Sequence, residues 1–493
     1  MANKMTHLNN DNTNSTAYDD ILISIVSYVY EPIEFSELAW TRAKAALLDA
    51  LGVAMEGIHS SAELNQLLGP VPPHSPIVEG GFKLPGTHYQ LDLLKGAFDL
   101  GTSIRYLDHN DAFPGAEWGH PSDNIGAILP VTDILCRRPH TTTSSHPSPT
   151  MKDVLTALIK AYEIQGTLQI ENAFNKIGLD HVILVKVAST AVVCWLLGLS
   201  RDQALAAVSH AWVDGHPLRV YRQAPNTGPR KGWAAGDAVQ RAVHLALLAA
   251  VGQPGVKSAL TAPKWGFYDV LFHSKQLSTP KPFGSWVVEN VLFKVNTAEG
   301  HGLTAIEAAL KLSKNMQRQG IVPELVERVR VRTHEAAMII INKSGPLHNA
   351  ADRDHDLRYM VAVVLLKGAQ IDTKDYQDES AWATDPRVEE LRRKITVVEE
   401  PQFTQDYHNI HIRSLTNAIQ ITLSDGTWLD EEVVEFPDGH VKSPNTLALV
   451  REKAVQNLGL KFNNDRVKEI IELVDSSTFD EVLVSDFIDL FTP

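Results

Sequence analysis

Titratable and amide side chains are unusually dense in residues 106–124, which contain the strings YLDHND and EWGHPSDN. Glycine and proline interrupt this stretch, so we expect a loop between two helices rather than one continuous helix. One interpretation is a solvated loop in which Ser122 or Asp123 caps the following helix. The other is an acid–base pair in which Asp108 and His120 converge from the end of one helix and the start of the next.

A second imidazole, that of His181, stands at the start of the apolar run 182–187. A single histidine at the start of a hydrophobic helix is more often a capping or core residue than a catalyst. A catalytic role is the alternative, because an unperturbed imidazole titrates close to neutral pH.

Cationic side chains gather in the Gly- and Pro-containing segment 219–237, which leads into the alanine-rich run 234–250. Arg222, Arg230 and Lys231 could bind a carboxylate there, because their charges would act together with the free amides at the start of the following helix. A basic surface loop is the alternative interpretation.

Two further polar clusters lie later in the chain. Lys294, Glu299 and His301 belong to the string FKVNTAEGH, where helical periodicity gives way to a mixed pattern. Junctions between domains often form small-molecule clefts. Lys343 lies in the string KSGP, upstream of the charged string DRDH. That last group could serve a site or could form salt-bridged caps for the helix that follows.

The elements that must position these side chains change in type along the chain. From residue 18 to about residue 252, apolar residues recur at three- and four-residue intervals, which predicts helices. Later, strand-like alternation appears at 329–333 and 419–423, and the second run leads into Asp425-Gly426, a strong hairpin signal. Helical segments separate these strands, and helical periodicity returns after about residue 445. The predicted fold is mainly α, with a large all-helical domain and a smaller α+β domain.

The domain boundaries follow from these changes. We predict a disordered tail at 1–17, a helical domain at 18–285, an α+β domain at 286–440 and C-terminal helices at 441–493. The segment 137–150 is rich in Pro, Ser and Thr and is expected to be a loop within the helical domain.

Composition excludes several classes of protein. The 493 residues carry 45 Lys and Arg against 59 Asp and Glu, a net charge of −14, which disfavours nucleic acid as a general partner. No apolar run reaches the roughly 18 residues that a membrane-spanning helix needs. Two cysteines are too few for a disulfide scaffold or a Cys-rich metal site. The first arginine is Arg42 and no secretory signal is evident, so we expect a cytoplasmic protein.

Short catalytic motifs such as GxGxxG, GxxxxGK[ST], HExxH and GxSxG are missing from the sequence. Longer strings instead resemble the signature blocks of the MmgE/PrpD family, which includes 2-methylcitrate dehydratases and cis-aconitate decarboxylases. These strings are LDHNDAFPGAEWGHPSDNIGAILP, GLDHVILVKVASTA, APNTGPRKGWAAGDA, ALTAPKWGFYDV, VLFKVNTAEGHGLTAIEAA and KSGPLHNAADRDHDLRYM. They occur in order between about residues 40 and 440.

The resemblance implies an α+β lid inserted into a helical domain to which the C-terminal helices return. It also implies a homodimer that works on a small tricarboxylate without a cofactor or metal. The family's active-site positions fall on Asp108, His120, His181, Lys231 and Lys294. We add as candidate substrate-binding residues Arg222, Arg230, Ser122, Glu299, His301 and Lys343.

Two positions depart from the family strings. Ala112 stands where a hydroxyl residue is common, and Gly300 stands where a bulky residue is expected. Both changes remove side-chain volume, so the sequence predicts a pocket that accepts an alkyl group longer than methyl.

The implied reaction is the dehydration of 2-methylcitrate or a longer 2-alkylcitrate to the corresponding 2-alkyl-cis-aconitate. Loss of a proton beside a carboxylate builds negative charge, which Lys231, Lys294 and Arg230 would stabilise. His120 or His181 would protonate the leaving hydroxyl.

In the same scheme Asp108 would orient a histidine or act as base, and the sequence leaves open which histidine is acid and which is base. The alternatives are decarboxylation of a cis-aconitate-like acid and non-catalytic binding of tricarboxylates. The strings EWGHPSDN and RKGWAAGDA favour dehydration over decarboxylation.

Overall fold

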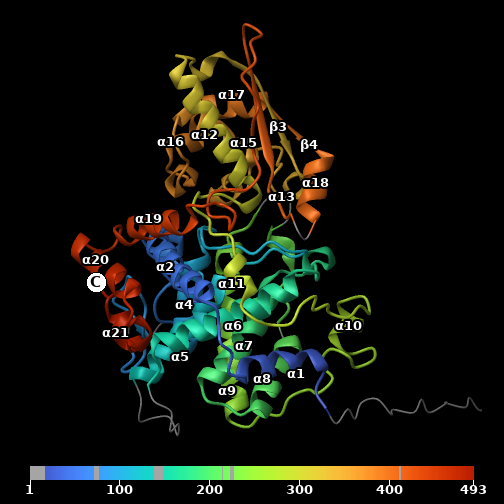
Figure 1. Cartoon of the computed structure of the whole chain (residues 1–493), viewed down its shortest axis with the longest axis vertical. Coiled ribbons are helices and arrows are strands. Elements are labelled where there is room, and N and C mark those ends of the chain that lie inside the picture. The colour runs from blue at the N-terminus through green and yellow to red at the C-terminus, as the bar shows by residue number, and fades with distance from the viewer. Residues whose placement is uncertain (1–16, 72–76, 138–147, 214, 223–226, 410–411) are drawn as a thin grey trace, which may run out of the picture.

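The computed structural model describes residues 17–71, 77–137, 148–213, 215–222, 227–409 and 412–493. The predicted tail at 1–17 lies outside the described residues except for Ala17, and so does most of the predicted loop at 137–150. The predicted fold class is confirmed: a large helical domain carries a smaller α+β domain (Figure 1).

The helical domain is built from amphipathic and fully apolar helices around one core. Its longer helices are α1 (Asp20–Tyr30), α2 (Glu37–Ser60), α4 (Leu93–Arg105), α5 (Ile125–Arg137), α6 (Met151–Gln169), α7 (Val182–Leu196), α8 (Arg201–Val213) and α9 (Arg230–Ala250). Shorter elements join them: α3 (Ala62–Leu67), α10 (Phe267–Val270), α11 (Trp286–Asn290) and the two-residue strands β1 (Phe82–Lys83) and β2 (Gln90–Leu91).

Small residues bring α4, α5 and α9 together almost backbone to backbone. A Cβ added to Gly126 would lie 2.6 Å from the Cα of Gly101, and one added to Gly236 would lie 2.6 Å from the carbonyl oxygen of Phe98. Only glycine allows so close an approach. As a result, the end of α4 lies beside the starts of α5 and α9, each of which follows a polar loop.

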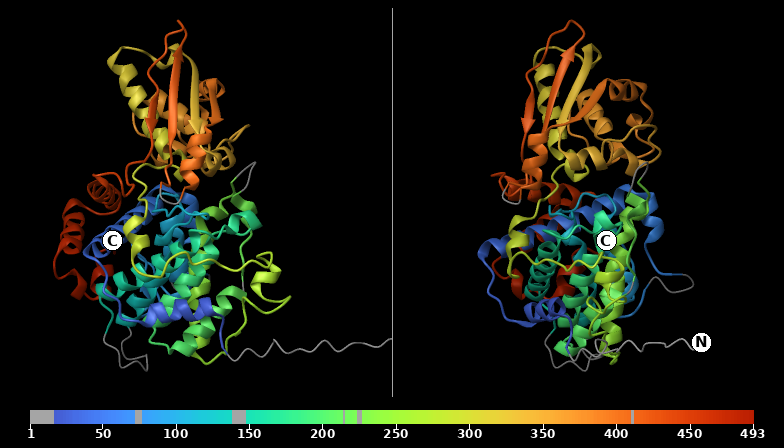
Figure 2. Two further views of the ribbon diagram at one scale, coloured as in Figure 1. Left: turned by 45° about the vertical axis from the view of Figure 1, so that its right-hand side comes forward. Right: turned by 90° about the vertical axis from the view of Figure 1, so that its right-hand side faces the viewer.

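The C-terminal segment packs on this helical domain. Helix α19 (Thr446–Leu458) lies along α2, and α20 (Asn464–Asp475) and α21 (Val484–Asp489) follow it down the same side (Figures 1 and 2). Val450, Ala454 and Phe487 are fully buried in the core that also contains the apolar face of α2.

The second domain has a four-stranded sheet in the order β4-β3-β5-β6. The strands are β3 (Val326–Thr333), β4 (Ile395–Glu399), β5 (Asn417–Leu423) and β6 (Glu432–Val434). β3 is parallel to β4 and antiparallel to β5, and β5 is antiparallel to β6. The predicted turn at Asp425-Gly426 does connect β5 to β6, and Gly426 adopts a φ of 86°.

Helices cover one face of this sheet (Figure 2, right). The main ones are α12 (Leu303–Arg318), α15 (Leu357–Lys367) and α17 (Pro386–Lys394), with the shorter α13 (Glu335–Ile340), α14 (Ala350–Arg353), α16 (Ala381–Thr384) and α18 (Pro401–His408). Val329 and Val331 of β3 are buried in this second core, whereas Arg328 and Arg330 are exposed on the other face. In the described residues, no helix is long and apolar enough to cross a membrane.

Candidate active site

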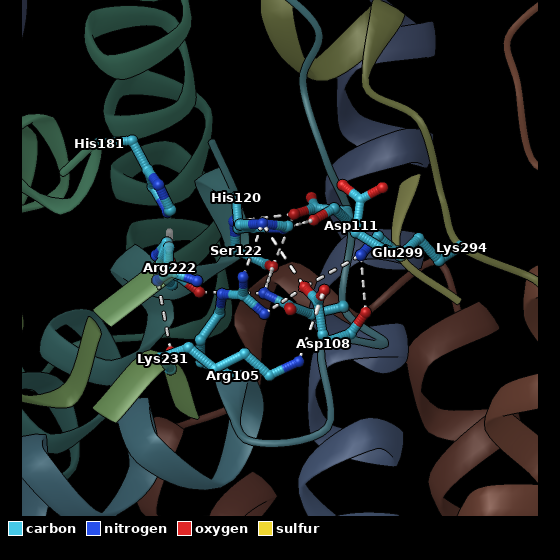
Figure 3. A network of polar contacts seen from close by, with 12 residues as sticks. Arg105, Asp108, Asp111, His120, Ser122, His181, Arg222, Lys231, Lys294 and Glu299 are labelled. Atoms are coloured by element: carbon cyan, nitrogen blue, oxygen red, sulfur yellow. Dashed lines mark hydrogen bonds and ion pairs between the residues drawn. The ribbon is translucent and has the colours of Figure 1, made fainter. Parts of the chain in front are cut away.

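The candidate site lies where the two domains meet, at the end of α4 and the starts of α5, α7 and α9 (Figure 3). α4 ends at Arg105, His120 precedes the short 3-10 helix η1 (Pro121–Asn124) that leads into α5, and His181 directly precedes α7. Lys231 is the second residue of α9. Lys294 approaches from the segment that connects the domains.

Asp108 stands at the centre of the site and is surrounded by positive charge. Its Oδ1 lies 3.0 Å from the Nζ of Lys294 and forms an ion pair with Arg105, while its Oδ2 lies 4.0 Å from the Nζ of Lys231. Burial by itself raises the pKa of this carboxyl, but the neighbouring Arg105 and Lys294 outweigh that effect and hold the pKa well below its usual range. Asp108 is therefore ionised at neutral pH.

His120 is fixed in one tautomer by its two partners. Its Nδ1 lies 2.6 Å from the carbonyl oxygen of Asp111 and must donate to it, so Nε2 carries the lone pair and accepts from Arg105 at 2.9 Å. Nε2 also lies 3.7 Å from Oδ1 of Asp108. Burial, together with the charges of Arg105 and Lys294, lowers the pKa of His120 well below its usual value. The imidazole is therefore neutral at neutral pH.

Asp111 holds the loop between Asp108 and His120 in shape. Its Oδ1 accepts from the hydroxyl of Ser122 at 2.6 Å, and its Oδ2 accepts from the hydroxyl of Tyr162 at 2.6 Å. The predicted substrate-binding residue Ser122 thus supports the loop through Asp111.

His181 presents an unpartnered nitrogen next to His120. Its Nδ1 lies 3.2 Å from Oδ1 of Asp180, and its buried Nε2 has no hydrogen-bond partner. The two imidazole rings are 5.4 Å apart between centroids. Arg222 donates to Oδ2 of Asp180 at 2.5 Å and so fixes the carboxylate behind His181. Burial lowers the pKa of His181 to about 3, although Asp180 opposes this.

The α+β domain contributes the partner of Lys231. The Nζ of Lys231 donates to Oδ2 of Asp354 at 2.7 Å, and His355 pairs with the same carboxylate. A cavity of about 260 Å³ opens on the outer side of this ion pair and is lined by Tyr106, Lys231, Gly232, Thr297, Ala351, Asp354 and Tyr376, among others. His120 and His181 do not line it, so in this structure they are closed off from the cavity.

Glu299 and His301 form a second interdomain cluster. Nδ1 of His301 lies 2.9 Å from Oε1 of Glu299, and its Nε2 lies 3.2 Å from the hydroxyl of Tyr407. The same hydroxyl accepts from the indole of Trp118, a residue of the helical domain, at 2.7 Å. Burial raises the pKa of Glu299, but His301, together with His355 and Lys294, outweighs burial and lowers it to about 2.

The indole of Trp118 fills the space next to Gly300. The prediction that this glycine enlarges the substrate pocket is therefore wrong. A Cβ added to Gly300 would lie 2.6 Å from the ring of Trp118. The glycine allows the indole to pack against the backbone and leaves no room there for substrate. Ala112, the other departure, is fully buried and bonds through its backbone to Leu292 in both directions, at 2.7 and 2.8 Å.

Two predicted substrate-binding residues lie away from the Asp108 network. Arg230 pairs with Asp237 at 3.2 Å and stacks on the ring of Trp233 at the surface. Lys343 forms an ion pair with Asp352 at 3.1 Å, and Thr227 is its other side-chain partner. Lys343 thus joins the two domains through Thr227 and Asp352, and Arg230 packs on the surface of α9.

The sequence reasoning missed Arg105, which contacts both Asp108 and His120. The sequence signal that could have identified it is an arginine in the last turn of a largely apolar helix, three residues before Asp108. The sequence reasoning also left open whether Asp354 and His355 serve the site or cap the helix that follows. Their importance depends on the contact between domains, which local sequence does not reveal.

This arrangement can bind an anionic substrate and move protons. Arg105, Lys231 and Lys294 provide fixed positive charge from buried side chains, and burial strengthens the effect of charge. Two neutral histidines lie against that charge. Within the part of the chain that the structure describes, no group of three or more His, Cys, Asp or Glu side chains is placed to hold a metal ion.

Comparison with known proteins gives full-length matches. The profile of the MmgE/PrpD N-terminal domain matches residues 25–280, and that of the MmgE/PrpD C-terminal domain matches residues 297–478. The chain is 64% identical to a "2-methylcitrate dehydratase-like protein" of Aspergillus oryzae, covering 98% of this chain and 97% of that one. It is 47% identical to an "alkylcitrate dehydratase" from a fungal species, covering 97% and 94% of the two chains. It is 48% identical to the "2-methylcitrate dehydratase" of Escherichia coli, covering 96% and 97%.

Proposed function

Because this chain belongs to the MmgE/PrpD family, we propose that it is a hydro-lyase that dehydrates 2-methylcitrate or a longer 2-alkylcitrate. The product is the corresponding 2-alkyl-cis-aconitate. The observation that carries this proposal is the convergence of two neutral histidines and three cations on one buried site. The names of three relatives with nearly full-length matches support the substrate class.

The reaction removes a proton from the carbon beside a carboxylate and expels hydroxide from the next carbon. Negative charge grows on that carboxylate as the C–H bond breaks, so fixed positive charge must face it. Lys231, Lys294 and Arg105 are the cations that meet this need. Asp108 pairs with Arg105 and Lys294 and lies 4.0 Å from Lys231. Because these cations hold its pKa well below the usual range, its carboxylate is a poor proton acceptor and serves as their anchor rather than as the base.

His181 is the group best suited to remove the proton. Asp180 holds its Nδ1 as the protonated nitrogen, which leaves the lone pair on the unpartnered Nε2. The lowered pKa keeps that lone pair free at neutral pH. His120 would protonate the leaving hydroxyl from Nε2, after the neutral imidazole has taken up a proton there on substrate binding, since a bound trianion raises the pKa of an adjacent imidazole.

The cavity beside Lys231 is the place for the alkyl group. Its volume of about 260 Å³ exceeds what a methyl group fills. Ala351, Gly232 and Tyr376 contribute to its walls next to the charged end formed by Lys231 and Asp354. A substrate whose carboxylate reaches Lys231 can extend its chain into this space.

The direct test is turnover of a chain-length series of 2-alkylcitrates by the purified, chelator-treated protein, followed by the ultraviolet absorbance of the unsaturated acid. We expect activity without added metal or cofactor. Carbon dioxide release from cis-aconitate would instead support a decarboxylase. Binding of alkylcitrates without turnover would support a carrier protein. Either result would overturn the proposal.

Two further properties remain proposals. A homodimer is implied by the family resemblance, and light scattering in solution is expected to give twice the mass of one chain. A cytoplasmic location is the second of these proposals. Microscopy of a C-terminal fluorescent fusion checks it, and a mitochondrial or secretory pattern would contradict it.

A further inference from the structure

Lys453 is a buried lysine of the C-terminal helix α19 that reaches the backbone of the site. Its Nζ donates to the carbonyl oxygens of His109 and Lys294, both at 2.7 Å, and pairs with Oδ1 of Asp49 at 2.8 Å. Two of the three donors of this ammonium are used on the backbone carbonyls, and Asp49 adds an ion pair to the same group. The side chain is only 6% exposed.

The two carbonyls belong to the loops that carry Asp108 and Lys294. The same two segments are joined by backbone hydrogen bonds between Ala112 and Leu292. That pair is a single antiparallel bridge and does not extend into a strand. Antiparallel pairing in this register would next bond Lys294 to Asn110. The carbonyl of Lys294 instead bonds to Lys453. The ammonium therefore joins the two loops where their own backbone pairing has stopped.

We propose that Lys453 is a positioning residue for the reaction: it sets the distance between the Asp108 carboxylate and the Lys294 ammonium. Those groups are 3.0 Å apart, and the Nζ of Lys294 also donates to the carbonyl of Asp108 at 2.7 Å. A shift of either loop changes both contacts. This inference rests on the proposed function, because it assigns a catalytic consequence to that geometry.

The test compares Lys453→Met with Lys160→Met. Lys160 is a second buried lysine that donates to two backbone carbonyls, those of Val29 and Glu31, at 2.6 and 2.9 Å, and it lies outside the site. Both changes remove a buried ammonium of equal size. We expect both to lower the melting temperature, and only Lys453→Met to lower kcat, by about 10- to 100-fold, as small misplacements of catalytic groups do. Equal kcat for wild type and folded Lys453→Met would overturn the inference.

A crystal structure of Lys453→Met gives a readout that does not depend on turnover. We expect the Nζ of Lys294 to move out of hydrogen-bonding distance from Oδ1 of Asp108, and an unchanged distance would overturn the inference even if the wild type dehydrates no alkylcitrate. An inactive wild type with the expected shift would count against the proposed function alone. If Lys453→Met does not fold, Asp49→Asn loosens the same ammonium and is expected to lower kcat several-fold, whereas an unchanged kcat would contradict the role.

Discussion

Asp108 combines strain and charge at a single residue. Its φ is 56°, in the left-handed region that few residues other than glycine adopt, although aspartate is among the more tolerant. The conformation is held by Lys294, which bonds to both its carbonyl and its carboxylate. Strained residues held this firmly are typical of functional sites. The same residue therefore fixes the backbone and gathers the cations.

His181 allows a direct test of the proposed base. His181→Asn keeps a polar side chain but removes the free lone pair, so kcat is expected to fall by about 10²- to 10⁴-fold. KM is expected to change little, because a neutral His181 adds no charge that binds substrate. His210→Asn, on α8, is the control and should leave both constants unchanged. Steady-state kinetics decide between these outcomes, and a higher KM with normal kcat would assign His181 to binding.

The same histidine gives stability a defined pH dependence. Burial lowers its pKa to about 3 in the folded protein, against about 6.5 in the unfolded chain. Between those values the unfolded chain binds more protons, so the free energy of unfolding falls as pH is lowered from about 6.5 towards 3. His181→Asn lacks this titration, so from pH 7 to pH 4 it should lose less stability than wild type, by on the order of 3 kcal/mol. Urea denaturation at both pH values measures the free energy of unfolding of each protein. Equal losses of stability in wild type and His181→Asn would refute the prediction.

Gly300 is expected to tolerate no side chain. In Gly300→Ala the new Cβ meets the Trp118 ring at 2.6 Å, and the indole is held by its bond to Tyr407. Overpacking of this kind lowers stability by about 1–3 kcal/mol. Thermal unfolding checks the change. Gly284→Ala is the comparison, since nothing lies within 4 Å of a Cβ there, and equal melting temperatures for the two variants would contradict the packing argument.

At the level of elements, the site depends on helix ends that meet. α4 delivers Arg105 and Asp108 from its C-terminal end, while α9 begins with Lys231. The α+β domain adds Asp354 from the end of α14. In this structure the ammonium of Lys231 is paired with Asp354. A substrate carboxylate that binds Lys231 would have to displace this partner.

Asp354→Asn is therefore expected to favour substrate binding. Without the competing carboxylate, KM for 2-methylcitrate should fall by about threefold to tenfold, the range that corresponds to a modest ion pair. Asp378→Asn is the matched control, because Asp378 lines the same cavity but pairs with Arg353. A rise in KM for Asp354→Asn would show instead that Asp354 helps to hold Lys231 in its productive position.

At the level of the whole molecule, much of the fold could be predicted from periodicity. The predicted strands at 329–333 and 419–423 and the turn at Asp425-Gly426 are present, because alternation and turn residues are local signals. β4 was not predicted, since its five residues directly follow α17 without a turn signal.

The polar strings around Asp108, His120 and His181 marked candidates, and only the family resemblance brought them together with Lys231 and Lys294. Arg105 was missed and the role of Asp354 stayed open, because their significance depends on tertiary contacts. The packing of Trp118 over Gly300 escaped for the same reason: it joins residues that lie far apart in the sequence.

The cavity between the domains offers a test of chain-length preference. Ala351→Phe places a ring in the space assigned to the alkyl group. We expect KM for long-chain 2-alkylcitrates to rise by about tenfold or more, since loss of contact with even one or two methylenes has this effect. KM for 2-methylcitrate should stay within about twofold. Ala448→Phe, on α19 and outside this cavity, is the control. Equal effects on short and long substrates would place the alkyl group elsewhere.

The return of the C-terminal helices to the first domain has a consequence for biosynthesis. A growing polypeptide that has emerged only as far as the lid already contains both histidines, Asp108 and Lys294. It still lacks Lys453, which joins the two loops, and α19, which covers α2. Full catalytic competence is therefore expected only after α19 has been synthesised and has packed on α2.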